Sequence, residues 1–409
     1  MRRLVLALFL YAAVCAAGLA WSVPVALALP LPDGPDDFNS AGFTVRHSWV
    51  KFAAVLGRPL AGSPSRAEED RLVARFFALN RDIAAQERIA GDPNSPPQQA
   101  ADAAAAADAM RAERHAMQDR VERILEGRLT HVAKEAGLTR HLGSDIIWPP
   151  PNIHFQEPPA VLVTSPRSEI RKEGQRLLRG ELPIDRIQQL ERAAEADGQT
   201  SALVVQIGGI AMYPAIIPPD DDYAFVLEDI AHEWMHQYLY FAPLGRNYFT
   251  SDKLTTLNET VADIVGRELG QMLLAEYPLD APPAYVAAAP VAPAGRGESA
   301  QRQRIDFVAE MRGLRREVET LLAQGQIEQA EARMEQEREF LAANGFYIRR
   351  LNQAYFAFHG SYADSAGSID PIGPKLDALR AQRSTLAAFV HTVQQFRSEA
   401  DLDRALAGG

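Results

Sequence analysis

Two histidines separated by three residues, His232 and His236, enclose a glutamate at position 233. On a helix, residues four apart lie on one face about one turn, ~5.4 Å, from each other, so both imidazoles can reach one metal ion. Glu233 stands at the side of that face, where its carboxylate could take a proton from water instead of binding the metal. The spacing is typical of a zinc site. The alternative is an amphipathic helix whose histidines only form hydrogen bonds.

A second stretch with apolar residues at helical spacing runs from Leu254 to Leu274 and contains Asn258-Glu259 followed by Asp263. Glu259 can supply the third protein ligand that a catalytic His-His-Glu zinc site requires. Asp263 lies one helical turn further along the same face, where it can accept the free ring N–H of a ligand histidine. The two stretches together therefore favour a Zn²⁺ site over two unrelated helices.

At these residues the chain resembles the gluzincin metallopeptidases, the thermolysin-like group, in which an H-E-x-x-H helix precedes a helix with N-E-x-x-x-D. The resemblance covers about thirty of 409 residues, and the gap between His236 and Glu259 is a little longer than in thermolysin, which a longer loop would absorb. It implies a zinc-hydrolase core in which His232, His236 and Glu259 bind the metal and Glu233 is the catalytic base. Asp263 and Asn258 would support the ligands.

The segment 138–276 is the predicted catalytic core. Short strands are expected at 152–156, 160–164 and 201–207, with a helix at 183–196 that Pro183 opens and Gly198 closes. Strands mixed with a metal-bearing helix predict an α+β fold: a gluzincin-like core with a small mixed sheet. In gluzincins an edge strand beside the zinc holds the substrate backbone, and 203–213 is the candidate here; an ordinary structural strand is the alternative.

Helical additions surround this core. Residues 65–137 read as two long helices, 65–90 and 98–137, joined by a turn rich in Pro and Gly, which predicts an antiparallel hairpin. The hairpin could pack on the catalytic core or bind a protein partner. Residues 277–299, rich in Pro and Ala, predict an exposed mobile loop.

The C-terminal region, 300–409, is predicted to be helical and to contribute to the active-site cleft. A helical pair is expected at 301–343 with a break at Gly325, and a last helix at 375–397. Between them, aromatic residues crowd the segment 346–362. This segment could be a core helix, or it could present His359 or Tyr362 to the zinc, as gluzincins commonly place a Tyr or His opposite the metal to stabilise the oxyanion.

The N-terminal residues 1–30 form a membrane signal, because Arg2 and Arg3 precede an uncharged run from Leu4 to Pro32 that is densely apolar through Leu29. Its length fits an uncleaved anchor, whereas Ala26-Leu27-Ala28 offers a cleavage site for a signal peptide. Either way the arginines predict export of the rest to the bacterial cell envelope, either anchored at the inner membrane or secreted. Residues 31–64 would be the linker that begins the exported part.

Composition bounds the partners. The chain has a formal charge of −11, and its first thirty residues contain two arginines and no acid, so the exported part carries −13. With no basic patch to offset this charge, nucleic acid is not expected as a partner. The only cysteine, Cys15, lies in the apolar run, which leaves no possibility of an internal disulfide.

These observations predict a membrane-attached, extracytoplasmic zinc peptidase that hydrolyses peptide or protein substrates with Glu233 as general base. Composition does not distinguish an endopeptidase from an aminopeptidase. The alternative is a non-catalytic scaffold or adaptor, in which zinc joins two helices and the helical arms bind a partner. A closed structural zinc site normally has four protein ligands, often cysteines, and the exported part has no cysteine.

Overall fold

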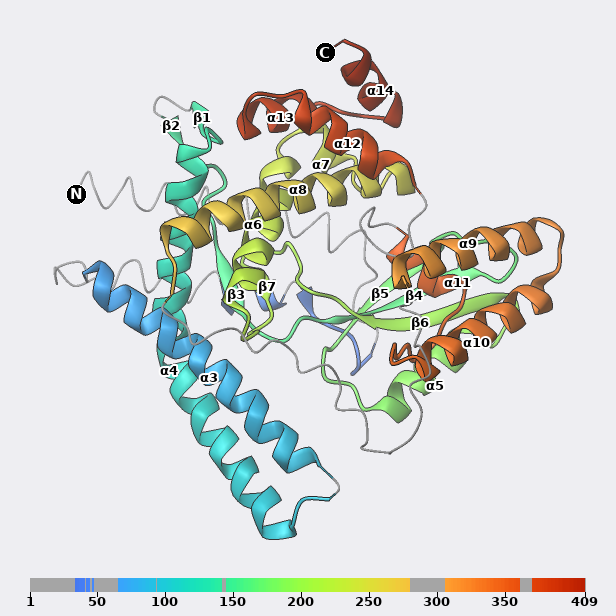
Figure 1. The fold of residues 1–409 in the computed structure, drawn as a ribbon, viewed down its shortest axis with the longest axis horizontal. Coiled ribbons are helices and arrows are strands. Elements are labelled where there is room, and N and C mark those ends of the chain that lie inside the picture. The colour runs from blue at the N-terminus through green and yellow to red at the C-terminus, as the bar shows by residue number, and fades with distance from the viewer. Residues whose placement is uncertain are drawn as a thin grey trace, which may run out of the picture.

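The computed structural model describes residues 34–40, 42–44, 46–47, 65–92, 94–141, 145–279, 306–360 and 370–408. The predicted membrane segment 1–30, most of the Pro/Ala-rich segment and Tyr362 lie outside these residues. Among the helices that are described, none combines the length and apolar character needed to cross a membrane. The architecture is a mostly helical α+β fold with small sheets and a long helical hairpin (Figure 1).

The hairpin consists of α3 (Arg66–Gly91) and α4 (Pro97–Glu135), which confirms the predicted helical pair. Ser65 and Glu68 form a capping box at the start of α3, and Pro97 occupies the first turn of α4, where its missing N–H costs nothing. The tip of the hairpin projects from the molecule (Figure 1), whereas Leu125 and Leu129 near its base join the main hydrophobic core. The base of the hairpin therefore packs on the core, and its tip does not.

Three antiparallel strands form the larger sheet in the order β5 (Gly174–Leu178), β4 (Ala160–Pro166) and β6 (Thr200–Gln206). Alternate residues of β4 and β6 face opposite sides, as the period of two requires. One side packs against α5 (Ile184–Ala194) and the other against α11 (Gln353–His359). In the described chain β6 pairs with β4 alone and is an edge strand.

Two smaller strand pairs complete the sheets. β3 (Ile153–Phe155) runs parallel to β7 (Ala215–Ile217), and β1 (Arg140–His141) pairs with β2 (Asp145–Ile146). Of the predicted edge segment 203–213, only the part to Gln206 is strand. Beyond it Ile210 forms a single bridge with Ile216 of β7.

The main core is built around α6 (Tyr223–Tyr240) and α8 (Asp252–Glu276), which pack along each other, with α7 (Pro243–Arg246) in the connection between them. Asp222 and Ser251 cap the two long helices by accepting backbone N–H groups three residues ahead. Trp234 and Tyr238 on α6 are fully buried, and their burial fixes the rotation of α6 about its axis. The opposite edge of that helix, which carries the histidines, consequently faces α8 and the cleft.

The C-terminal region confirms one helical prediction and corrects another. α9 (Phe307–Ala323) and α10 (Ile327–Ala343) form the expected pair, broken at Gly325, whose φ of +74° suits glycine. The single helix predicted at 375–397 is wrong. That region contains α12 (Ile372–Ala381) and α13 (Leu386–Val393), and α14 (Glu399–Ala407) follows. The chain breaks there because Thr385 caps a new helix by accepting the N–H of Ala388.

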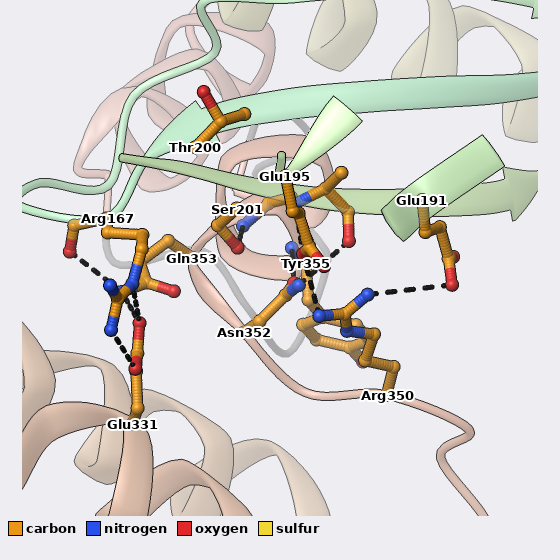
Figure 2. A network of polar contacts seen from close by, with 12 residues as sticks. Arg167, Glu191, Glu195, Thr200, Ser201, Glu331, Arg350, Asn352, Gln353 and Tyr355 are labelled. Atoms are coloured by element: carbon orange, nitrogen blue, oxygen red, sulfur yellow. Dashed lines mark hydrogen bonds and ion pairs between the residues drawn. The ribbon is translucent and has the colours of Figure 1, made fainter. Parts of the chain in front are cut away.

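Polar contacts attach this region to the larger sheet (Figure 2). Arg167 at the end of β4 forms a two-pronged ion pair with Glu331 of α10, with both N···O distances at 2.7 Å. Gln353 donates to the carbonyl of Arg167 and to Glu331. Asn352, the residue before Gln353, donates to the carbonyl of Ala202 on β6. The segment before α11 is thereby held against the edge of the sheet.

Candidate metal centre

Packing of α6 on α8 brings the two predicted motifs face to face. His232, Glu233 and His236 lie on α6, and Glu259 lies on α8. The helices approach closely because α8 has glycine at the contact: a Cβ at Gly266 would lie 3.1 Å from the Cβ of His232 and 3.0 Å from a backbone oxygen of α6. Glycine on α8 therefore sets the separation that lets side chains of both helices reach one point.

The three predicted ligands converge at that point. The Nε2 atoms of His232 and His236 are 3.0 Å apart, and they lie 3.7 Å and 3.5 Å from Oε2 of Glu259. Ligands about 2.1 Å from a tetrahedral zinc ion are separated by about 3.4 Å. All three side chains are largely buried. This His-His-Glu group could bind a metal ion.

Both imidazoles are oriented through their other nitrogen. Nδ1 of His232 lies 2.9 Å from Oδ1 of Asp263, and Nδ1 of His236 lies 2.7 Å from Oδ1 of Asn258. An acceptor at Nδ1 keeps the proton there and leaves Nε2 free to bind a cation. The structure thus places Asp263 and Asn258 in contact with one histidine each.

Glu233 lies beside this group and outside it. Its carboxylate is buried, and burial, opposed by the charges of His232 and His236, raises its pKa. The backbone at position 209 runs close to this carboxylate: a Cβ at Gly209 would lie only 2.6 Å from Oε1 of Glu233. Glycine at position 209 therefore leaves the space that the carboxylate occupies.

The electrostatics of the three ligands favour one negative carboxylate between two basic rings. Burial works against the charged form of Glu259, yet the neighbouring His236 and His232 hold its pKa far below the usual range. Burial likewise opposes protonation of His232, but its contacts with Asp263 and Glu259 and the nearby charges raise its pKa well above the ordinary value. A site with this much negative potential attracts a cation.

The sequence prediction did not include Tyr248, which precedes α8. Its hydroxyl donates to Oε1 of Glu259, its ring meets that of His236 edge-on with centroids 6.1 Å apart, and its carbonyl accepts from Thr255. Glu259 thus has one oxygen held by Tyr248 and the other directed at the histidines. Tyr248 stands outside the helical spacing that revealed the other residues, so no pattern in the sequence indicates it.

Asp229, one turn before Glu233 on α6, was also missed. It lines the cleft, and its Oδ2 atom is buried without a hydrogen-bond partner. Burial, together with the charge of Glu233, raises the pKa of Asp229 to about 8. A carboxyl group in this environment is largely protonated at neutral pH.

The site opens into a cleft of about 590 Å³. Its walls come from α6, from the loop after α7, from α8 and from the chain that continues β6 (residues 206–211). Apolar side chains dominate the walls: Val161, Leu177, Ile207, Ile210, Phe225, Phe249 and Phe358. A volume of this size suits a small molecule or a short peptide segment.

Of the two candidates in the aromatic segment, His359 does not join the site. His359 is not among the residues that line the cleft; its ring lies against Tyr355, 4.2 Å between centroids, and burial lowers its pKa to about 4. Its neighbour Phe358 lines the cleft instead. Tyr362 falls outside the described residues. The aromatic segment contributes an apolar wall, as an aromatic core helix would.

No protein-family model, curated protein or solved structure matches this chain.

Proposed function

We propose that this chain is a zinc-dependent peptidase with a gluzincin-like active site. The observation that carries the proposal is the triangle formed by His232, His236 and Glu259, with Glu233 beside it and an open cleft in front. Two imidazoles and one carboxylate are the ligand set of zinc peptidases that leave a coordination position open. The donor types and spacing fit Zn²⁺.

His232, His236 and Glu259 would hold the zinc ion, which when bound would polarise the scissile carbonyl and lower the pKa of water to about 7. Glu233 then accepts the proton of the attacking water, because its carboxylate is buried next to the ligands and binds none of them. Burial that raises its pKa makes it a better base near neutral pH. Glu233 afterwards passes the proton to the leaving amine.

The remaining residues position this machinery. Asp263 and Asn258 fix the ring planes of His232 and His236, and Tyr248 fixes the carboxylate of Glu259. The chain after β6 lies along the cleft next to Glu233, where an extended peptide can add to the edge of the sheet. A peptide bond placed there lies within reach of Glu233.

A scaffold function is the competing proposal. A structural zinc site encloses its metal with four protein ligands, whereas the group found in the described chain has three and faces a cleft. These features favour catalysis. The tip of the α3–α4 hairpin projects from the molecule and could bind a protein partner under either proposal.

The decisive experiment combines metal analysis with digestion of a broad peptide library. The purified protein should contain about one zinc per chain and cleave a subset of the library. A chelator should abolish cleavage, and added zinc should restore it. A protein that binds no zinc, or that binds it and cleaves nothing, would contradict the peptidase.

We further propose that residues 1–30 attach the enzyme to the bacterial envelope with the catalytic core outside the cytoplasm. Protease added to spheroplasts should then digest the core without disruption of the membrane. Survival of the core until the membrane is broken would contradict this orientation.

A further inference from the structure

The outer edge of β6 is blocked by side chains over part of its length. At Val204 the N–H donates to Oε1 of Glu191 at 2.8 Å, and the carbonyl accepts from Arg349 at 3.2 Å. At Ala202 the N–H donates to Glu195 and the carbonyl accepts from Asn352, both at 2.9 Å. All four outward main-chain groups of these two residues are occupied, so no further strand can pair there.

The blocking side chains are themselves held in place. Arg349 forms a two-pronged pair with the buried Glu191, and Arg350 binds Glu195 at 2.6 Å. Figure 2 shows Arg350 between Glu195 and Glu191, with Asn352 beside them. Because a buried carboxylate that loses its cation is costly, this arrangement resists displacement by a peptide.

The block ends where the cleft begins. In an antiparallel ladder outward groups recur at every second residue, so Gln206 is the next outward position after Val204. Within the described chain and outside the ladder to β4, neither Gln206 nor residues 207–209 make a main-chain to main-chain hydrogen bond. At the other end, Ile210 and Ile216 bond to each other in both directions. The open edge is therefore 206–209, about 13 Å of extended chain.

This open edge lies against the metal centre. All four of its residues line the cleft, and a Cβ at Gly209 would lie 2.6 Å from Oε1 of Glu233. A Cβ at Gly208 would meet no atom within 4 Å, so space is open there. Around the opening, Phe225 and Phe249 are 46% and 48% exposed. Large exposed aromatics at the rim of a cleft are suited to apolar side chains of a ligand.

We propose that the site takes an extended peptide segment with apolar side chains, paired with the edge 206–209 over about four residues. The side chains bound to the main chain of Ala202 and Val204, those of Glu191, Glu195, Arg349 and Asn352, stop the pairing at Val204. This inference rests on the proposed peptidase function and makes it selective for short substrate segments. Residues of a longer peptide beyond this segment add nothing to binding.

The test measures binding by the zinc-loaded Glu233→Gln protein, which should not consume its ligand. Fluorescent peptides of alternating Leu and Ala are lengthened one residue at a time from about two to about ten residues. We expect the affinity to rise by about two- to tenfold per paired residue, to level off at about four residues and then to stay constant. An affinity that keeps rising beyond about six residues, or no binding at any length, overturns the inference.

A matched pair of variants places the peptide on the edge. Gln206→Pro removes the outward N–H without touching the ladder to β4, whereas Gln206→Ala keeps it; both lose the side-chain bond to Gly180. The proline variant should bind the four-residue peptide about two- to tenfold more weakly than the alanine variant. Gly208→Val, for which the protein has room, should weaken binding as well. Equal binding by Pro and Ala variants, with Gly208→Val unaffected, overturns the inference.

The outcomes also separate this inference from the function beneath it. If binding reaches a plateau but the wild-type protein cleaves no peptide, the proposed peptidase function is wrong and the short binding edge is supported. If the protein cleaves peptides but binding shows no plateau with length, the peptidase function is supported and the short binding edge is wrong.

Discussion

Two groups of histidine and glutamate side chains in this protein have similar donor atoms but different surroundings. His131 and Glu135 lie one turn apart on α4, and Nε2 of His131 is 3.0 Å from Oε1 of Glu276 and 3.5 Å from that of Glu135. These side chains are 49%, 54% and 30% exposed, in that order for His131, Glu135 and Glu276. The group that contains His232 and His236 has comparable spacings but is buried.

The two groups have donors at similar distances and differ in burial and in the contacts that hold the donors. Water competes for every atom of the exposed group, and an exposed ion pair contributes little. In the buried group Asp263, Asn258 and Tyr248 fix each ligand in the orientation that a cation needs. Burial and orientation therefore distinguish the candidate metal centre from an ordinary surface cluster.

The largest expected effect separates the proposed catalytic base, Glu233, from the proposed metal ligands. Glu233→Gln keeps the size of the side chain but cannot accept a proton, so turnover should fall about 10²–10⁴-fold. Zinc content and the unfolding midpoint should stay near those of the wild type. Peptide hydrolysis and metal analysis on the same preparation measure both. Full hydrolysis by Glu233→Gln would show that the buried group does not work as proposed.

Next in size is the loss of a ligand, compared between the two groups. Glu259→Gln removes the anionic donor of the buried group and should weaken zinc binding by more than about a hundredfold, with activity partly restored by excess zinc. Glu135→Gln is the matched change in the exposed group and should leave zinc content and activity unaltered. Zinc titration against a competing chelator measures the affinity. Equal losses from the two variants would erase the distinction between the groups.

A smaller effect is expected from the residues that orient the histidines. Asp263→Asn can no longer hold the charge that faces Nδ1 of His232, so zinc affinity or activity should fall about 10–100-fold. The protein should still bind zinc more tightly than Glu259→Gln does. Measured side by side, a loss in Asp263→Asn as large as that in Glu259→Gln would make Asp263 a ligand instead.

A last effect concerns the pH dependence of stability and a half-buried histidine outside both groups, His359. Burial lowers the pKa of His359 from its ordinary 6.5 to about 4, so the unfolded chain binds a proton in this range and the folded chain does not. Stability that is present above pH 6.5 is therefore lost as the pH falls toward 4. His359→Leu should reduce this loss relative to the wild type. Urea unfolding midpoints between pH 4 and 7 test the difference, and identical pH profiles for His359→Leu and wild type would contradict it.

Local spacing was enough to predict the two helices that carry the site. The helical period of 3.6 residues is visible in the sequence. It relates His232, Glu233 and His236 on one helix, and Glu259 and Asp263 on another. The α3–α4 hairpin and the α9–α10 pair were equally legible, because Pro and Gly mark their ends. What these elements share is that their signals are local in sequence.

Other features were not indicated by the spacing of residues in the sequence. Tyr248 reaches Glu259 only because the connection after α7 folds back over α8, and His359 turns toward Tyr355 while its neighbour Phe358 lines the cleft. The single helix expected at 375–397 failed for a local reason: the cap at Thr385 outweighed the apolar periodicity on either side.

The edge of β6 shows most clearly which features the sequence determines and which depend on the tertiary structure. Its β-forming residues, 201–207, are evident from the sequence, but nothing in them tells which main-chain groups remain open. That depends on Glu191 of α5 and on Arg349 and Asn352, which lie about 150 residues later in the chain and meet the strand only in the folded protein. Sequence determined which donors and helices exist, because propensity and periodicity act over a few residues. Tertiary structure decided which of them are buried, oriented and accessible, because hydrogen bonds and burial join residues without regard to their separation along the chain.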